Sequence, residues 1–569
     1  MRNLFNTLTT SFSSTIPPAP PNTNETPQQT MQVDFPIPPH ILIIGAGSRG
    51  HAYASALTHS TNAVIAAVAE PLPFKRVEFG KKFIWGKNSP RPEQQFEDWR
   101  MWVKYEIARR ERERAGESVE RGVDALVVCV LDEMHVEVLE GVGPLELHVL
   151  SEKPLATTLE GCLRIWEALG KRKGVDGGKN EEEGGGEVVN GKRGAKETVF
   201  GICHVLRYSP HNMLLRELVL EREVIGDVLS IEHVEPVGWW HFSHSYVRGN
   251  WRKESVTAPS LLTKSCHDID FIMWMLCSPP PNSKEPPHLP SFLTSTGSRK
   301  FFKKSRKPEA AGEATNCLSC PIEEDCNYSA NKIYLARNLL FGNAGWPVKI
   351  VNPEIEDCYN TFGVEAASEK LLGSLREDYA KDTPVSEVES RPWFGRCVWE
   401  SDNDVCDDQC VTITWDDDPL PSGDGGKSSL KGRGAKTAQF HMVAFTEKIC
   451  ERRGRIYGTK GEIEYDSSKI KVHDFRTGYT KTHHPHQTGG GHGGGDEGLA
   501  RQFVMAVDAV NHQGMSAADA QRKYLGCDLE EAFRSHAMVF AAEDARKQRK
   551  VIDWKQWWSD QVERHLHQR

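Results

Sequence analysis

The sequence predicts an α/β fold that begins with a parallel sheet, and two observations carry this prediction. Short apolar runs rich in Ile and Val occur at 40–44, 63–69, 124–130 and 147–152. A segment long enough for a helix separates each run from the next. Strands that are apolar along their whole length are typical of a parallel sheet buried on both faces. The segment 86–118, which contains RMWVKYEIARRERER, predicts an additional charged surface helix.

Length and composition set the number of domains. The chain has 569 residues, of which 38% are hydrophobic, and this length exceeds what one hydrophobic core supports. Polar stretches predict surface insertions at 170–197, 278–315 and 416–436, a disordered leader at 1–37 and a tail at 551–569. A mitochondrial presequence is the alternative for the Ser- and Thr-rich first thirty residues. We therefore expect two domains, at 38–205 and 206–550.

Charge and cysteine content exclude several classes of protein. A formal net charge of -9 argues against a general nucleic-acid binder. No run of eighteen apolar residues occurs, so we expect no membrane span. The 14 cysteines in a chain without a recognisable signal peptide indicate a reducing compartment, and we expect a cytoplasmic protein.

The segment ILIIGAGSRG carries the first functional motif. Gly45, Gly47 and Gly50 fit the pattern G-x-G-x-x-G between an expected strand and an expected helix. In that setting the first glycine makes a tight turn, the second admits a pyrophosphate, and the third lets the helix pack on the strand. Phosphates would then face the helix N-terminus, beside Ser48 and Arg49. We predict a doubly wound, Rossmann-type domain that binds NAD(P); a glycine turn without a ligand is the alternative.

The next strand tests this prediction, because it should end in an acid that accepts hydrogen bonds from a ribose. It ends at Glu70, twenty residues after Gly50. A carboxylate there favours NAD over NADP, since a 2′-phosphate would meet a like charge. Lys75 and Arg76 follow closely and leave NADP open. A later strand delivers Glu152 and Lys153 to the same edge of the sheet, where ligands bind in such folds.

Together these motifs resemble the Gfo/Idh/MocA family of nicotinamide-dependent sugar and cyclitol oxidoreductases. The similarity rests on GAGSRG with Glu70, VCVLDEMH at 128–135 and EKP at 152–154, and it extends from about residue 38 to 550. Among family members, the streptomycin-pathway cyclitol dehydrogenases look most similar. The resemblance implies that His135, Glu152 and Lys153 contact the cofactor. It also implies a C-terminal α/β domain with an open, mainly antiparallel sheet, preceded by HVLRYSP at 204–210.

The family's signature helix carries the pattern D-x-G-x-H-D, which this chain matches in part. In LLTKSCHDID, His267 matches the histidine, while Thr263 stands where the family has its aspartate. The resemblance implies that Lys153 and His267 are catalytic and flank a substrate carbinol, with Lys264 and Asp268 as substrate contacts. Histidine suits this role because its ordinary pKa lies near neutrality. Thr263 puts in doubt any proton relay through an aspartate.

The segment VGWWHFSHSYVRGNWRKES at 237–255 is rich in His, Trp and Arg. Aromatic faces stack on sugar surfaces, and cationic side chains bind hydroxyl, phosphate or carboxylate groups. We therefore predict a substrate-binding loop; a strand and loop at a subunit interface are the alternative. Its predicted substrate contacts are His241, His244, Arg248, Trp251 and Arg252.

Two further segments offer weaker signals. Cys317, Cys320 and Cys326 form a C-x2-C-x5-C array, for which Cys358 and Cys266 are candidate fourth ligands. We expect free thiols there and no metal, with a structural zinc as the alternative. In the glycine-rich segment 487–507, Asp496 is expected to cap a helix, and His492 is ranked low as a site residue.

The sequence therefore predicts an NAD(P)-dependent oxidoreductase that interconverts alcohol and ketone on a sugar, cyclitol or related polyol. Its cofactor is expected to be NAD, with NADP open, and its partners a small-molecule substrate and further copies of itself. Two alternatives remain: an NAD-dependent glycosidase on the same fold, and a non-catalytic regulator that senses nucleotides.

Overall fold

The computed structural model describes residues 32–170, 198–280, 283, 285–420, 430, 432–486 and 491–567. The predicted insertion at 170–197 and the leader up to residue 31 fall almost wholly outside this part of the chain. The predicted insertion at 416–436 lies partly outside it. The two sheets of the described chain belong to one compact unit.

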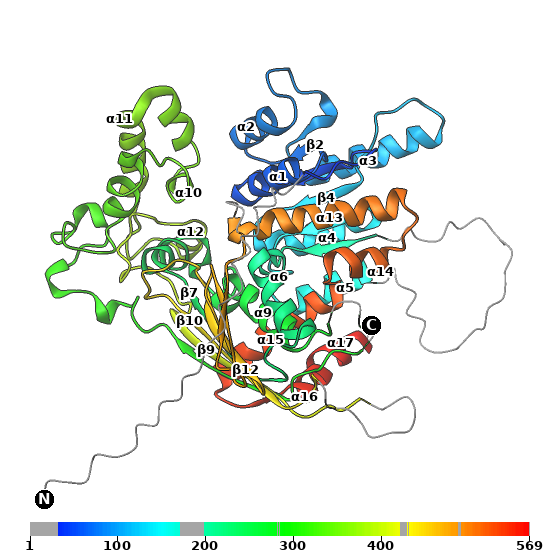
Figure 1. Cartoon of the computed structure of the whole chain (residues 1–569). Coiled ribbons are helices and arrows are strands. Elements are labelled where there is room, and N and C mark those ends of the chain that lie inside the picture. Colours follow the sequence, from blue (N-terminus) through cyan, green and yellow to red (C-terminus); the bar gives the residue numbers. More distant parts are fainter. Residues whose placement is uncertain are drawn as a thin grey trace, which may run out of the picture. The chain divides into compact units, whose positions relative to one another are not determined.

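The N-terminal part contains a six-stranded parallel sheet in the order β3-β2-β1-β4-β5-β6 (Figure 1). Its strands are β1 His40–Ile44, β2 Val64–Ala69, β3 Gln95–Phe96, β4 Ala125–Val128, β5 His148–Ser151 and β6 Phe200–Ile202. The helices are α1 Ser48–Ser60, α2 Pro73–Phe83, α3 Trp99–Arg114, α4 His135–Val142 and α5 Leu159–Gly170. The predicted parallel sheet and the charged helix α3 are confirmed.

Burial explains why these strands are apolar throughout. Residues 41–44 of β1 are at most 1% exposed, since both faces of the sheet are covered by other elements. The edge strands β3 and β6 are only two and three residues long. Such short strands give no apolar run, so the sequence did not indicate them.

The C-terminal part contains a nine-stranded sheet in the order β14-β13-β12-β11-β7-β10-β9-β8-β15. Only β7 and β10 pair in parallel, so the predicted mainly antiparallel sheet is confirmed. Its strands are β7 Val228–Pro236, β8 Phe292–Ser298, β9 Asp408–Trp415, β10 Lys436–Val443, β11 Arg453–Gly458, β12 Gly461–Tyr465, β13 Ile470–Asp474, β14 Thr480–His483 and β15 Ile552–Asp553.

Helices from the C-terminal part join the two sheets. α13 packs against α1, and α15 packs against α5, α9 and β8; Figure 1 shows α13 lying beside α1. The helices of this part are α6 Pro210–Arg216, α7 Trp239–Phe242, α8 Ser260–Thr263, α9 Cys266–Leu276, α13 Gly495–His512, α14 Ala517–Ala520, α15 Leu529–Gln548, α16 Trp554–Trp558 and α17 Arg564–His567. The start of α9 is thereby brought to the carboxyl edge of the parallel sheet.

Two segments, one predicted as a surface insertion and the other as a tail, are built into the fold. The predicted insertion 278–315 contains β8, and Leu293 and Phe302 within it are fully buried. The predicted tail 551–569 supplies β15, α16 and α17, and its Trp554 is 2% exposed. Both predictions were wrong for these residues, because their few apolar side chains are the ones that pack.

A large excursion separates β8 from β9 and is here called the 299–407 insert. It contains the helices α10 Val348–Val351, α11 Ile355–Arg376 and α12 Val385–Glu389, which Figure 1 shows grouped together. The insert has a small apolar core of its own around Leu371, Leu375 and Phe394. The helical segment 239–252 packs against that core through Trp239 and Trp240.

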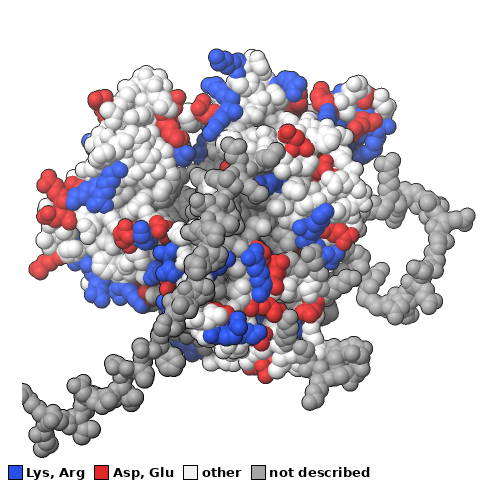
Figure 2. Space-filling model, in the orientation of Figure 1, with Lys and Arg blue, Asp and Glu red and all other residues white. Residues whose placement is uncertain are grey.

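The surface is charged, with both signs present. In Figure 2, Lys and Arg are interspersed with Asp and Glu over the described residues of the face shown. None of the described helices combines the length and the apolarity needed to cross a membrane.

Candidate active site

The glycine-rich loop has the geometry that a pyrophosphate requires. Gly45 has a φ of +96°, and a Cβ there would lie 2.5 Å from the carbonyl oxygen of Cys129. A Cβ on Gly50 would lie 2.1 Å from the carbonyl oxygen of Gly45, whereas one on Gly47 would meet open space. No side chain caps the start of α1, and Ser48 is exposed there. The N–H groups of the first turn therefore fit a phosphate.

Glu70 holds this loop in place. Its carboxylate accepts hydrogen bonds from the amides of Ala46, at 2.8 Å, and Leu72, at 3.0 Å. Arg76 donates to the Glu70 carbonyl at 2.5 Å and pairs with Glu97 at 3.4 Å, so its charge is already engaged.

A cavity of about 520 Å³ begins two residues after Glu70. One wall consists of Leu72–Lys75, and the opposite wall comes from residues 350–354 and 391–394 of the 299–407 insert. The insert thus reaches the part of the domain where the adenosine of a dinucleotide lies in this type of fold. Lys75 is the cation beside Glu70 that faces this cavity.

Arg49 joins the glycine loop to two distant elements. Its guanidinium bonds to Glu152, after β5, at 2.5 Å and to Asp496, in α13, at 2.8 Å. Asp496 does not cap α13 as predicted, because the helix follows Gly494 and has no side-chain cap. Although burial raises the pKa of the Asp496 carboxyl, the hydrogen bond from His492 and the Arg49 charge hold it well below its usual range.

Lys153 points from the end of β5 toward α8. Its ammonium donates to the backbone carbonyl of Thr263 at 2.8 Å and lies 5.8 Å from the centre of the Trp251 ring. The Thr263 hydroxyl donates to the Pro259 carbonyl at 3.3 Å, so it does not act as a relay. A backbone carbonyl therefore orients the lysine at the position where the family has its aspartate.

His267 lies beside Lys153 at the start of α9. It is 6% exposed, and its Nδ1 has no hydrogen-bond partner. Burial, and after it the charge of Lys153, keeps the pKa of His267 well below its ordinary value. The imidazole is thus neutral at pH 7 and can accept a proton. The rings of His204 and His492 each have their centres 6.0 Å from that of His267.

Two histidines near this pair, His204 and His536, were not singled out from the sequence. His204 has both ring nitrogens buried without hydrogen bonds, and burial lowers its pKa to about 3. It lies 3.6 Å from Asp270, which Arg207 binds at 2.7 Å. His536 accepts from the amide of Leu155 at 2.9 Å and so fixes the loop after Lys153. Only His204 had a sequence signal, as the first residue of HVLRYSP.

His135 also acts on that loop. Its Nδ1 lies 2.6 Å from the Pro154 carbonyl, and the side chain is fully buried. In this structure it positions the segment that carries Lys153. Contact with a cofactor, as the resemblance implies, stays a prediction.

One of the predicted substrate contacts, Trp251, borders the pair, while Lys264 and His241 meet at the sulfur of Cys450. Trp251 donates from its indole to Asp132 at 2.9 Å. The ammonium of Lys264 lies 2.8 Å from the Cys450 sulfur and 3.3 Å from Glu235. His241 lies 3.8 Å from the same sulfur.

The other four predicted substrate contacts are buried in different contacts. His244 bonds to the Tyr334 hydroxyl at 2.9 Å and stacks on Phe394. Arg252 pairs with Asp402 at 2.7 Å. Both residues are therefore buried against the 299–407 insert. Arg248 is buried against it as well, because its guanidinium donates to the Arg396 carbonyl at 2.6 Å. The prediction that these side chains reach the substrate was wrong, because the covering insert was not foreseen.

Asp268 belongs to a buried charge network under β7. It accepts hydrogen bonds from His233 at 2.8 Å and from Arg452 at 3.0 Å, and Arg452 also pairs with Glu235. Burial raises the pKa of the Glu235 carboxyl despite the Arg452 charge. The Asp268 carboxylate therefore ties α9 to His233 and Arg452.

Comparison with known proteins identifies the N-terminal part. A family profile described as "Oxidoreductase family, NAD-binding Rossmann fold" (GFO_IDH_MocA) matches residues 40–175, which include the glycine loop, Glu70 and Lys153. These residues form a Rossmann domain that matches the NAD-binding domain of the Gfo/Idh/MocA oxidoreductases. The predicted NAD cofactor and enzyme class are thereby confirmed.

Relatives extend the likeness over most of the chain. The Bacillus subtilis (strain 168) protein YteT, which bears an oxidoreductase name, is 22% identical over 403 residues, covering 68% of this chain and 73% of that protein. An inositol dehydrogenase homologue from Azotobacter vinelandii, solved with NAD+, matches with a TM-score of 0.54 at 13% identity, covering 92% of this chain and 99% of that one. Levoglucosan dehydrogenase, solved with NADH and levoglucosan, matches with a TM-score of 0.51 at 13% identity, covering 91% and 99%. At these identities the structures show a shared fold.

Proposed function

We propose that this oxidoreductase interconverts a secondary alcohol and a ketone on a sugar, cyclitol or related polyol. The observation that carries the proposal is the meeting of Lys153 and His267. One comes from the carboxyl edge of the NAD-binding sheet, and the other from the first turn of α9. The two side chains differ in charge, one a held ammonium and the other a neutral imidazole, as acid–base work on one hydroxyl requires.

Each group has a defined task in the oxidation direction. The Thr263 carbonyl holds one N–H of Lys153, and the remaining N–H groups are free to donate to the substrate oxygen and stabilise negative charge on it. His267, kept neutral by burial, accepts the hydroxyl proton. The bound nicotinamide supplies the hydride acceptor. In the reverse direction the same two groups return the proton to the carbonyl oxygen.

The surroundings of the pair suit a polyol. Trp251 offers an aromatic face beside the Lys153 ammonium, and such faces stack on the C–H surfaces of sugars. His492 adds a polar group beside His267. Structures of similar fold include levoglucosan dehydrogenase and an inositol dehydrogenase homologue, which supports the same substrate class. A homo-oligomeric state and a cytoplasmic location stay predictions.

The cofactor proposal favours NAD over NADP. Glu70 places a carboxylate where the adenosine ribose is bound in this fold, and Arg76 is engaged elsewhere. We expect Lys75, on the wall of the 520 Å³ cavity, to allow weak use of NADP.

The experiment is a nicotinamide absorbance assay with NAD and NADP against sugars, inositols, anhydrosugars and uronates. We expect reduction of NAD with at least one polyol. Lys104→Ala, an exposed lysine on α3, serves as the matched control for lysine variants at the site and should keep wild-type turnover.

The same assay separates the two alternatives. Release of an alcohol from a glycoside without net NADH formation would replace the proposal with the glycosidase. Binding of NAD without turnover of any compound in the panel would replace it with the regulator.

A further inference from the structure

Four cysteines from two distant segments converge on one small cavity. The cavity has a volume of about 20 Å³, and the sulfur-bearing residues around it are Cys317, Cys320, Cys326 and Cys397. The first three belong to the C-x2-C-x5-C array, and the fourth follows far along the 299–407 insert. Neither Cys358 nor Cys266, the fourth ligands considered from the sequence, lines this cavity. A cavity of this size has room for one small occupant.

Backbone hydrogen bonds bring the first and fourth cysteines together. The amide of Cys317 donates to the Gly395 carbonyl at 2.9 Å, and the amide of Cys397 donates to the Thr315 carbonyl at 2.8 Å. These bonds form an isolated antiparallel bridge between Asn316 and Arg396. The backbone therefore brings Cys317 and Cys397 together independently of any bond between the thiols.

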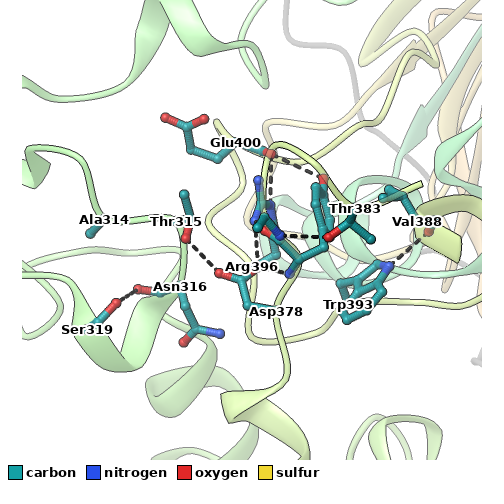
Figure 3. A network of polar contacts seen from close by, with 12 residues as sticks. Ala314, Thr315, Asn316, Ser319, Asp378, Thr383, Val388, Trp393, Arg396 and Glu400 are labelled. Atoms are coloured by element: carbon teal, nitrogen blue, oxygen red, sulfur yellow. Dashed lines mark hydrogen bonds and ion pairs between the residues drawn. The ribbon is translucent and has the colours of Figure 1, made fainter. Parts of the chain in front are cut away.

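Side chains next to these cysteines lock the bridge. Arg396 pairs with Asp378 at 2.6 Å, and Asp378 accepts a hydrogen bond from Thr315 at 2.7 Å. Asn316 donates to the Leu375 carbonyl at 2.8 Å. Figure 3 shows Arg396 and Thr315 converging on Asp378 from the two strands of the bridge. The structure thus holds these two cysteines in a built frame.

The buried side chain of Arg248 indicates that an occupant of this cavity would carry negative charge. This guanidinium is 1% exposed, and its Nη2 lies 3.3 Å from the Cys317 sulfur. Its other hydrogen bonds go to the carbonyls of Arg396 and Tyr328, while Nη1 is buried without a hydrogen bond. Among the described residues, no carboxylate forms an ion pair with it. A buried cation without an anion is costly, and neutral thiols do not supply that anion.

A metal at this cavity would supply the missing negative charge, because it binds thiolates and releases their protons to solvent. Four thiolates around one divalent ion leave a net charge of about −2. That charge would neutralise Arg248.

We propose that Cys317, Cys320, Cys326 and Cys397 bind a metal centre through four thiolates, with Arg248 as its buried counter-charge. The centre would link the 299–407 insert to the helical segment 239–252 through Arg248. The turn that follows Arg248 in this segment places Trp251 beside Lys153. It is separate from the proposed oxidation chemistry, since Lys153 and His267 do not border this cavity.

The spacing of the sulfurs separates two forms of this centre. Among the described residues, three potential ligand atoms lie within 4.8 Å of one another only at Asp408, Cys410 and His441, so no three of the four sulfurs are that close. A zinc ion, with Zn–S bonds of about 2.3 Å, would draw them inward. An iron–sulfur cluster, which adds its own iron and sulfide atoms, would keep them wider apart and would have to enlarge the 20 Å³ cavity.

The test is the metal content of the full chain, purified without oxygen and without chelators. Zinc, iron and acid-labile sulfide are measured per chain, and the visible spectrum is recorded. We expect either about one zinc without visible absorption, or iron and sulfide in equal amounts with visible charge-transfer absorption. Either result supports the thiolate centre and identifies its form.

Variants then assign the ligands. Cys320→Ser and Cys397→Ser should lose at least about nine-tenths of the metal, whereas the control Cys358→Ser, on α11, should keep it. Full metal content in Cys397→Ser would overturn the assignment. Wild-type protein that contains neither metal and does not take up added zinc would overturn the proposal. If the serine variants do not fold, alkylation of wild-type protein still decides: the four cysteines should react only after a chelator is added.

Discussion

The two regions that collect reactive side chains, the edge of the NAD-binding sheet and the four-cysteine cavity of the 299–407 insert, are built differently. At the sheet edge, Gly45, Glu70 and Lys153 each end or follow a strand, so the order of the parallel strands brings them together. In the insert, Cys397 meets Cys317 through a short bridge between loops. The regular order of strands therefore lets the first site be predicted from the sequence. The second site depends on a contact between loops, so its fourth cysteine, Cys397, could not be predicted.

Loss of the proposed base gives the largest expected effect. His267→Ala should lower kcat by roughly 10²- to 10⁴-fold, the usual contribution of a general acid–base group. Its affinity for NAD should change less than about threefold, because the glycine loop is untouched. Steady-state kinetics on the best polyol and fluorescence titration with NAD measure the two effects. His473→Ala, on β13, is the matched control, and equal losses of kcat in both variants would count against the role of His267.

The buried charge network below α9 should dominate stability. Arg452→Met leaves Asp268 and Glu235 buried without their shared cation. We expect the free energy of unfolding to fall by about 3–5 kcal/mol. Urea denaturation measures this difference. The double variant with Asp268→Asn should recover part of the loss, since one uncompensated charge is removed. A loss below about 1 kcal/mol would show that the network does not support α9.

The glycines of the loop separate folding from cofactor binding. A Cβ on Gly50 would strike the Gly45 carbonyl, whereas one on Gly47 would meet nothing in the protein itself. Gly50→Ala should therefore lower the melting temperature by several degrees. Gly47→Ala should leave it almost unchanged and weaken NAD binding by about tenfold or more, because its methyl group occupies the pyrophosphate position. The opposite pattern would contradict the placement of the cofactor.

A further expected effect is a loss of stability in mild acid. Burial, the main cause in each case, lowers the pKa of four histidines to about 3 or 4: His51, His204, His244 and His536. In the unfolded chain they bind protons below about pH 6.5. Their contribution is therefore fully present above pH 6.5 and is lost as the pH falls from there toward 4.

Urea midpoints at pH 7.5, 6.5, 5.5 and 4.5 test this pH dependence. Carboxyls with lowered pKa values, such as Asp270, lose their contribution only at lower pH, so the histidines dominate this range. His204→Leu should flatten the slope by about one histidine's share, and a flat wild-type profile would contradict the burial of these rings.

Much of the first region could be predicted from the sequence. The apolar strands, the glycine loop, Glu70 and Lys153 occupy the elements expected of them, because strand polarity and loop spacing are local properties. The contact between Arg49 and Asp496 was not predictable, since these residues lie 447 positions apart. The orientation of Lys153 by the Thr263 carbonyl was not predictable either, because every residue type offers the same backbone carbonyl.

The errors share a different physical cause. His244, Arg248 and Arg252 lie in a segment whose composition suits a sugar-binding loop, yet the 299–407 insert covers them. Aromatic and cationic side chains satisfy a buried interface as well as a substrate pocket. Composition alone does not distinguish a buried interface from a substrate pocket, because the position of the 299–407 insert is not known from the sequence. For the same reason Cys397 could not be assigned to the cysteine array.

The most direct test of the central claim is turnover by Lys153→Met, which removes the ammonium while keeping a long side chain beside Trp251. Nicotinamide absorbance is followed at saturating NAD and polyol, and bound NAD is quantified in the same samples. We expect NAD binding within about threefold of wild type and turnover at least about 100-fold lower. Turnover within tenfold of wild type would show that the proton chemistry does not depend on Lys153.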